Sequence, residues 1–204
     1  MKIKVCGMSD PQNIIEVSNL NPDFMGFIFY ENSIRNSTQP IPKISASILK
    51  TGVFVDASFD FIKQKVVENN LAVVQLHGNE PPEFCRELDD LDVQIVKVFS
   101  VSNTFDFSDL LPYETLVDYY LFDTKGKKPG GNGFVFNWSV LNEYPSNKPF
   151  ILSGGIGLNE LEAIAKLNAR DLPLYAIDLN SKFETLAGLK SVEMLKEFFI
   201  KIKK

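Results

Sequence analysis

An aspartate stands where an apolar run gives way to a segment rich in glycine and lysine. Residues 119–138 read YYLFDTKGKKPGGNGFVFNW, and Asp123 closes the apolar part. A buried strand needs apolar side chains, so an acid at its last position lies where a barrel of parallel strands opens to its ligands. The alternative is that Asp123 only caps the following turn, as aspartate often does. The first interpretation makes Asp123 a candidate active-site group.

Three more polar residues, Cys6, His77 and Asp178, stand at the ends of other apolar runs. Strand residues alternate between faces, so ends that point inward would meet Asp123 at one mouth, with Lys4 one layer deeper. Branched apolar side chains ordinarily fill a barrel core, so four polar ends are more easily explained by a ligand site. Each has a structural alternative, since a buried cysteine is usually a small hydrophobe and an aspartate can cap a loop.

The sequence offers few residues that could bind a metal. The chain has one histidine and two cysteines, Cys6 and Cys85, which form no CxxC pair. They cannot make up a zinc signature, and they are too few for a disulfide framework. We therefore expect chemistry that needs neither a metal nor a cofactor.

Two loops late in the chain are candidates for binding phosphate. The first holds Gly154 and Gly155 after an apolar run, and the second holds Asn180 and Ser181 after the next run. Barrels often bind phosphate with backbone N–H groups of the loops after the seventh and eighth strands. Their position after the seventh and eighth predicted strands is stronger evidence for phosphate binding than their glycines are.

Eight short apolar runs of the buried, parallel-strand kind supply the strands that would position these groups. They cover residues 3–6, 24–29, 52–55, 73–77, 95–99, 119–123, 150–153 and 175–179. Amphipathic segments separate several of them, and the first has Asp10 as a candidate N-cap before Pro11. Segments 44–49, 107–111 and 138–141 are expected to be short helices at most.

Eight such units predict an α/β fold, a compact single-domain (β/α)8 TIM barrel over residues 1–204. The alternative is an open doubly wound sheet, which normally shows a glycine-rich phosphate turn after the first strand. That turn reads CGMSDP here. The closed barrel is therefore favoured.

Composition narrows the class of partner. The 204 residues carry a formal net charge of −5, spread without blocks, which disfavours nucleic acid and acidic membrane surfaces as partners. There is no leader-like segment at Met1 and no apolar stretch of membrane-spanning length. We expect a soluble cytoplasmic protein that binds a small molecule, as a monomer or a homodimer.

A set of short motifs occurs in order along almost the whole chain. They are CGM at 6–8, GFIF at 26–29 followed by Arg35, VQLHG at 74–78, LFDT at 121–124, GGNG at 130–133, FNW at 136–138 and LSGG at 152–155. With these motifs the chain resembles phosphoribosylanthranilate isomerase. The motifs are specific together, although no single one is.

The resemblance implies an Amadori rearrangement in tryptophan biosynthesis, which converts N-(5-phosphoribosyl)anthranilate to a 1-deoxyribulose phosphate. It implies that Cys6 is the general base and Asp123 the general acid. Both roles need shifted pKa values, an acid raised by burial and a thiol lowered by positive neighbours. Lys4, or a helix N-terminus near Asp10, is a candidate for lowering the thiol pKa.

The resemblance also assigns binding roles. It implies that Arg35 pairs with the anthranilate carboxylate, that His77 and Asp178 line the pocket, and that residues 125–133 form a lid. The phosphate would be held by Gly154, Gly155, Asn180 and Ser181. The family commonly has Ser-Ser-Gly where this chain has Asn180, Ser181 and Lys182, which changes the backbone available to the phosphate and adds a charge.

Other functions share parts of this pattern. An epimerase, an indole-glycerol-phosphate synthase or a histidine-pathway isomerase would share the fold and the phosphate loops. Cys6 together with Asp123 distinguishes the favoured isomerase from these enzymes. A barrel that only binds a phosphorylated ligand, or a thiol sensor built on Cys6, is a non-enzymatic alternative. The sensor requires a resolving thiol nearby, whereas Cys85 is expected on an outer helix.

Overall fold

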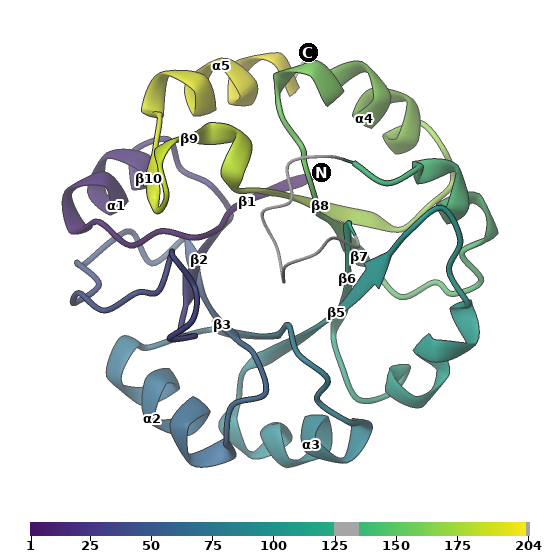
Figure 1. Ribbon diagram of the computed structural model, residues 1–204, viewed down its shortest axis with the longest axis horizontal. Coiled ribbons are helices and arrows are strands. Elements are labelled where there is room, and N and C mark those ends of the chain that lie inside the picture. The colour runs from purple at the N-terminus through teal and green to yellow at the C-terminus, as the bar shows by residue number, and fades with distance from the viewer. Residues whose placement is uncertain (125–134, 203–204) are drawn as a thin grey trace.

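The computed structural model describes residues 1–124 and 135–202. A closed barrel of parallel strands in the order β1 to β8 forms its centre, and Figure 1 looks along the barrel. The strands are β1 (Lys2–Val5), β2 (Phe24–Ile28), β3 (Leu49–Phe54), β4 (Val73–Leu76), β5 (Gln94–Val101), β6 (Tyr119–Thr124), β7 (Phe150–Leu152) and β8 (Leu174–Leu179). The predicted barrel and its eight strands are confirmed, and the open sheet is excluded.

The strands are buried on both faces, as parallel strands covered by helices must be. The inside of the barrel is filled by a separate apolar cluster made of Phe24, Val73, Val96, Val98, Tyr119, Leu121, Ile151 and Ala176. On the outer face of β6, Phe122 packs against Tyr144 with ring centroids 5.7 Å apart. Because strand residues alternate, this packing turns the next residue, Asp123, inward.

Among the described residues, five α-helices surround the barrel (Figure 1). They are α1 (Pro11–Ser18), α2 (Phe59–Asn69), α3 (Pro82–Glu87), α4 (Leu161–Asn168) and α5 (Val192–Ile202). The predicted start of α1 is confirmed, because Asp10 Oδ1 accepts a hydrogen bond of 2.8 Å from the backbone N–H of Asn13. No helix in the described ranges is long and apolar enough to span a bilayer.

Short 3₁₀ helices complete the connections: η1 (Leu88–Leu91), η2 (Phe107–Tyr113), η3 (Trp138–Glu143), η4 (Leu158–Glu160) and η5 (Ser181–Phe183). Segments 107–111 and 138–141 lie within η2 and η3, as expected. Residues 44–49 form no helix, because a turn ends where β3 begins at Leu49. There the Ser45 hydroxyl accepts a 3.3 Å bond from the Ser47 N–H, a local turn that competes with helix formation.

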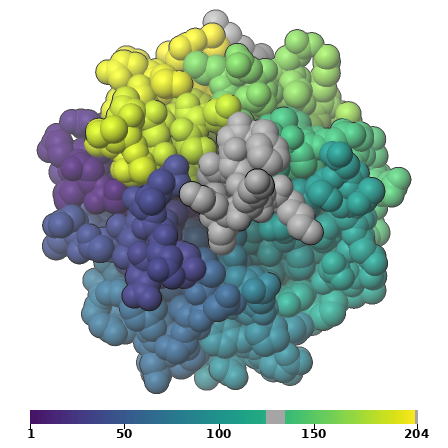
Figure 2. All heavy atoms as spheres, in the orientation of Figure 1, coloured from purple at the N-terminus to yellow at the C-terminus, as the bar shows by residue number. Residues whose placement is uncertain are grey.

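An antiparallel hairpin that the sequence does not predict follows β8. It consists of β9 (Glu184–Leu186) and β10 (Leu189–Lys190), and its turn contains Gly188 at a φ of 82°. Figure 2 shows this yellow-green segment against the blue segment that follows β2, at the mouth of the barrel. The hairpin therefore joins the rim of the site described next.

Candidate functional site

A cavity of about 410 Å³ opens at the carboxyl ends of the strands. Every residue that the sequence predicts for the site lines it: Cys6, Arg35, His77, Asp123, Gly154, Gly155, Asp178, Asn180 and Ser181. The predicted convergence of four polar strand ends at one mouth is therefore confirmed. The proposed lid, residues 125–133, lies outside the described residues.

A buried ion pair lies next to the Cys6 thiol. Lys4 Nζ is 3.0 Å from Asp178 Oδ1, and both side chains are nearly inaccessible, at 1% and 5% exposure. Ser153 Oγ lies 3.3 Å from the other oxygen of Asp178. Burial by itself disfavours the charge on Lys4, but Asp178 and Cys6 more than offset it and raise the Lys4 pKa. Burial also raises the pKa of Asp178, yet we favour the ionised pair, because a neutral Asp178 would leave a buried cation unpaired.

The thiol pKa differs in direction from the sequence-based expectation. Burial of Cys6 raises its pKa above the ordinary value of 9.0. Lys4 opposes this shift, as the sequence suggests, but it does not overcome the loss of hydration. The net shift is therefore opposite to the lowered thiol pKa expected from the sequence, although the contribution of Lys4 has the expected sign. Lys4 limits the rise rather than producing a fall.

Position 26, next to Cys6, has no room for a side chain. A β-carbon built on Gly26 of the neighbouring strand β2 would lie 2.6 Å from Cys6 Sγ. Such a contact is well inside van der Waals distance, so any side chain there displaces the thiol. Glycine at position 26 is thus part of how the fold places the sulfur in the cavity.

His77 contacts Asp123 directly as well as lining the cavity. Its Nε2 lies 3.3 Å from Asp123 Oδ2, while Asp123 Oδ1 accepts a 2.9 Å bond from the backbone N–H of Thr124. Gln75 Nε2 lies 3.3 Å from His77 Nδ1. When Gln75 donates to Nδ1, the imidazole carries its proton on Nε2 and can donate it to Asp123. Gln75 Oε1 is buried at the cavity and has no partner among the described residues.

The predicted phosphate loops face the same cavity. Gly154 and Gly155 have φ values of 89° and 66°, which favour glycine, and a β-carbon on Gly154 would collide with Thr124. Asn180 and Ser181 come from the loop that starts η5, where Asn180 Oδ1 accepts a 2.7 Å bond from Lys190 Nζ. Lys182 is exposed and is not part of the cavity lining.

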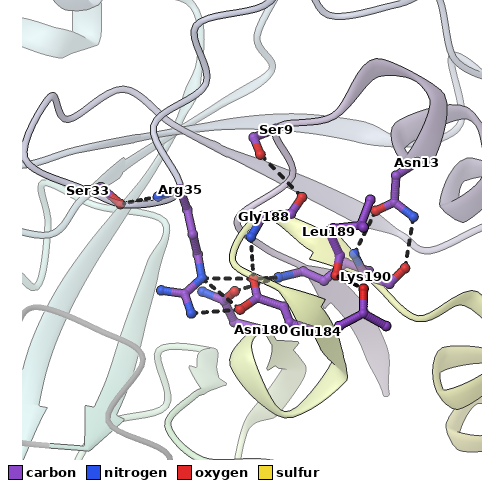
Figure 3. A network of polar contacts seen from close by, with 10 residues as sticks. Ser9, Asn13, Ser33, Arg35, Asn180, Glu184, Gly188, Leu189 and Lys190 are labelled. Atoms are coloured by element: carbon purple, nitrogen blue, oxygen red, sulfur yellow. Dashed lines mark hydrogen bonds and ion pairs between the residues drawn. The ribbon is translucent and has the colours of Figure 1, made fainter.

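Arg35 reaches the cavity from the loop after β2 and is held by Glu184, an acid that is not among the site residues predicted from the sequence. Its Nε and Nη2 lie 2.8 and 2.7 Å from the two oxygens of Glu184, and Figure 3 shows the pair seen from close by. Lys190 Nζ contacts the same carboxylate at 2.6 Å. Glu184 and Lys190 flank the short segment TLAGL, which has neither helical nor strand periodicity, so no sequence pattern singles them out.

Charge is unevenly distributed around this acid. Burial would raise the pKa of Glu184, but Arg35 and Lys190 outweigh burial and hold it below its ordinary value. Arg35 and Lys190 both contact this one carboxylate, and Glu184 opposes the lowering of the Lys190 pKa that burial causes. The cavity thus offers a thiol and a carboxyl for proton transfer, a guanidinium for a carboxylate, and glycine-rich backbone for a phosphate.

Comparison with known proteins matches this chemistry. Residues 3–201 match the family described as N-(5'phosphoribosyl)anthranilate (PRA) isomerase. A relative from Parabacteroides distasonis named N-(5'-phosphoribosyl)anthranilate isomerase is 43% identical, and the alignment covers 99% of this chain and 93% of the relative.

Solved structures with this fold bear the same name. A phosphoribosyl anthranilate isomerase from Thermotoga maritima superposes with a TM-score of 0.85 at 27% identity, covering 100% of this chain and 98% of that one. Another has a TM-score of 0.81 at 25% identity, with the same coverage, and is bound to reduced 1-(o-carboxyphenylamino)-1-deoxyribulose 5-phosphate. The ligand of that protein carries a carboxylate at one end and a phosphate at the other.

Proposed function

Because this chain belongs to the N-(5'-phosphoribosyl)anthranilate isomerase family, we propose that Cys6 and Asp123 perform the proton transfers of that family's reaction. The chain is an isomerase of tryptophan biosynthesis, and this favours that activity over the binding barrel, the thiol sensor and the other phosphosugar enzymes.

Asp123 acts first, as the general acid. Its protonated carboxyl gives a proton to the ribose ring oxygen, the bond from C1′ to that oxygen breaks, and the nitrogen lone pair of the anthranilate forms a C1′=N double bond. His77, at 3.3 Å from Asp123, orients the carboxyl toward the cavity. Positioned proton transfer of this kind contributes about 10²- to 10⁴-fold to a rate.

Cys6 acts next, as the general base. Its thiolate removes the proton from C2′, the C–H electrons form a C1′=C2′ double bond, and the nitrogen regains its lone pair. The enol so formed loses its hydroxyl proton and gains one at C1′, which gives the ketone. The substrate neither gains nor loses protons overall, so the resting enzyme returns when Cys6 passes a proton to Asp123 through product or solvent.

The rest of the cavity binds the two ends of the substrate. Arg35 pairs with the anthranilate carboxylate, a planar anion that suits a guanidinium fork. Gly154, Gly155, Asn180 and Ser181 hold the phosphate at the opposite end. Asp178 keeps Lys4 charged beside the thiol, through a contact of 3.0 Å. All of these residues come from one chain, so these roles suit a monomer or a homodimer equally.

The observation that supports the proposal best is that the cavity is lined by both Cys6, which follows β1, and Asp123, which lies near the end of β6. The test is the loss of phosphoribosylanthranilate fluorescence, with substrate generated in place from anthranilate and phosphoribosyl pyrophosphate. Cys6→Ser should nearly abolish the loss. Cys85→Ala is the matched control, because that thiol lies in α3 outside the cavity lining and its removal should leave kcat unchanged. A Cys6→Ser enzyme with normal kcat would remove Cys6 from the mechanism.

Four expectations from the sequence remain predictions alongside this proposal. They are a cytoplasmic location, the absence of nucleic acid partners, the absence of a cofactor, and one domain that spans residues 1–204.

A further inference from the structure

A buried network in the β9–β10 hairpin connects the two ends of the proposed substrate site (Figure 3). Glu184 accepts from Arg35 on one side and from Lys190 on the other, at 2.7 and 2.6 Å. Lys190 Nζ also donates to Asn180 Oδ1, at 2.7 Å. These contacts therefore connect the Arg35 guanidinium, which is proposed to bind the substrate carboxylate, to Asn180 in the loop that is proposed to bind the phosphate.

The network is well shielded from solvent. The side chain of Lys190 is 0% exposed, that of Glu184 is 7% exposed and that of Arg35 is 13% exposed. The backbone N–H of Gly188 donates to Glu184 at 3.1 Å, so the hairpin turn also holds the carboxylate. Surface ion pairs fix geometry poorly, whereas a buried, multiply bonded carboxylate holds its partners in one arrangement.

The contacts leave one edge of Arg35 available. Nε and Nη2 are occupied by Glu184, while Nη1 donates to no group among residues 1–124 and 135–202. Arg35 itself lines the cavity. Glu184 thus fixes the plane of the guanidinium while the remaining donors can meet a ligand.

Cys6 is tied to the same arrangement through the residue that follows it. Gly7 has a φ of 74°, and a β-carbon there would lie 2.8 Å from Arg35 Cδ and 2.7 Å from Asn180 Oδ1. The side chains of Arg35 and Asn180 therefore pack directly against the backbone of Gly7, the residue after Cys6. Any shift of Arg35 or Asn180 is also a shift relative to the Cys6 thiol.

We infer that Glu184 and Lys190 are positioning residues that fix the distance between the carboxylate-binding and phosphate-binding ends of the site. This inference rests on the proposed roles of Arg35 and Asn180. Neither Glu184 nor Lys190 lines the cavity, so each acts through its neighbour. Together they keep the groups that bind the carboxylate and the phosphate of the substrate at a fixed spacing, with Cys6 between them.

The first test is a double-mutant cycle on KM, with kcat measured separately. Glu184→Gln should raise KM about tenfold, the loss expected when a hydrogen bond from a charged group is misplaced, and should change kcat much less. Arg35→Met should raise KM at least as much. In the Arg35→Met background, Glu184→Gln should raise KM no further, because the residue through which it acts is gone.

Three further variants control for the loss of charge and for failure to fold. Glu193→Gln makes the same change in charge at an exposed site close in sequence, and it should leave KM unchanged. Glu184→Asp keeps the buried charge balance and shortens the side chain by one methylene, so it should fold and give an intermediate KM. Lys196→Met serves as the exposed control for Lys190→Met.

The second test probes the phosphate end with inorganic phosphate as a competitive inhibitor. Lys190→Met should weaken its inhibition several-fold, since Asn180 loses its partner, whereas Arg35→Met should weaken it less, because Arg35 reaches Asn180 only through Glu184 and Lys190. Equal inhibition of wild type and Lys190→Met would overturn the role of Lys190.

The outcomes separate this inference from the proposal beneath it. If Arg35→Met leaves KM unchanged, the carboxylate contact of Arg35 is wrong, and the inference falls with it. If Arg35→Met raises KM but folded Glu184→Gln and Glu184→Asp do not, only the positioning role is overturned. Additive effects of Arg35→Met and Glu184→Gln on KM would also overturn it, since a purely structural Glu184 acts independently of Arg35.

Discussion

Gly26 and Cys6 face each other across the β1–β2 pair so closely that no β-carbon fits between them. The distance from a β-carbon on Gly26 to Cys6 Sγ would be 2.6 Å. Gly26→Ala should therefore push the thiol out of line and lower kcat by about 10²-fold, the cost of misplacing a reacting group by about 1 Å. Steady-state fluorescence assays check this.

Gly52→Ala is the control for that substitution. A β-carbon on Gly52 of β3 would meet the side chains of Leu71 and Phe54, outside the catalytic cavity. It should lower the melting temperature while kcat stays near wild type. Equal kcat in Gly26→Ala and Gly52→Ala would show that the close approach to Cys6 has no catalytic consequence.

Asp123→Asn should reduce kcat by about two orders of magnitude or more and leave KM within a few-fold, since the proton is delivered in the transition state. The amide keeps the shape of the carboxyl, so thermal unfolding should stay close to wild type. His77→Gln is the companion variant. It removes the hydrogen-bond partner of Asp123 but not a group that is proposed to transfer a proton to the substrate, so a smaller drop in kcat is expected. A larger drop in His77→Gln than in Asp123→Asn would reassign the general acid.

The direction of the Cys6 shift predicts how the thiol titrates. Its pKa lies above 9.0, so the fraction of Cys6 that is thiolate should rise with pH through and above the neutral range. Lys4 lowers this pKa, so Lys4→Met should move the rise to higher pH, while Lys4→Arg keeps the charge and should move it less.

The thiolate can be followed without turnover by its ultraviolet absorbance. Burial raises the pKa of Cys85 to about 11, so its titration would overlap that of Cys6. The titration should therefore be run in the Cys85→Ala background, with and without the Lys4→Met substitution. A Cys6 midpoint that does not move when Lys4→Met is added would contradict the effect of the buried cation.

Acid should weaken the fold partly through Glu184. Its pKa in the folded chain lies below the ordinary value of 4.5, so the ionised form stabilises the fold above that pH, and the stability is lost as pH falls through the lower, folded value. Urea unfolding at about pH 7 and about pH 4 should show a smaller acid-induced loss for Glu184→Gln than for wild type. Glu193→Gln should behave as wild type, and an equal loss in all three would refute the assignment.

Much of the barrel follows from local pattern. The apolar runs identify all eight strands because parallel strands buried on both faces must be apolar throughout. Side-chain alternation then brings Cys6, His77, Asp123 and Asp178 together, since residues at the ends of parallel strands meet at one edge. These conclusions need only the chain's own periodicity.

Other features depend on contacts that periodicity does not encode. Segment 44–49 has the apolar spacing of a helix, yet a serine turn competes with it. Glu184 and Lys190 read as ordinary polar loop residues until the hairpin buries them beside Arg35. The Cys6 pKa depends on a balance between burial and the Lys4 charge, and only the packed structure sets that balance.

The hairpin also closes the molecule late. Lys190 exchanges two hydrogen bonds with Asn13, at 2.8 and 2.9 Å, across 177 positions of sequence. A nascent chain on the ribosome therefore carries Cys6, Arg35 and Asp123 long before it carries the acid that orients Arg35. Catalytic competence should emerge only near the end of translation, and products of premature termination before the hairpin should be inactive even though they contain both proposed catalytic groups.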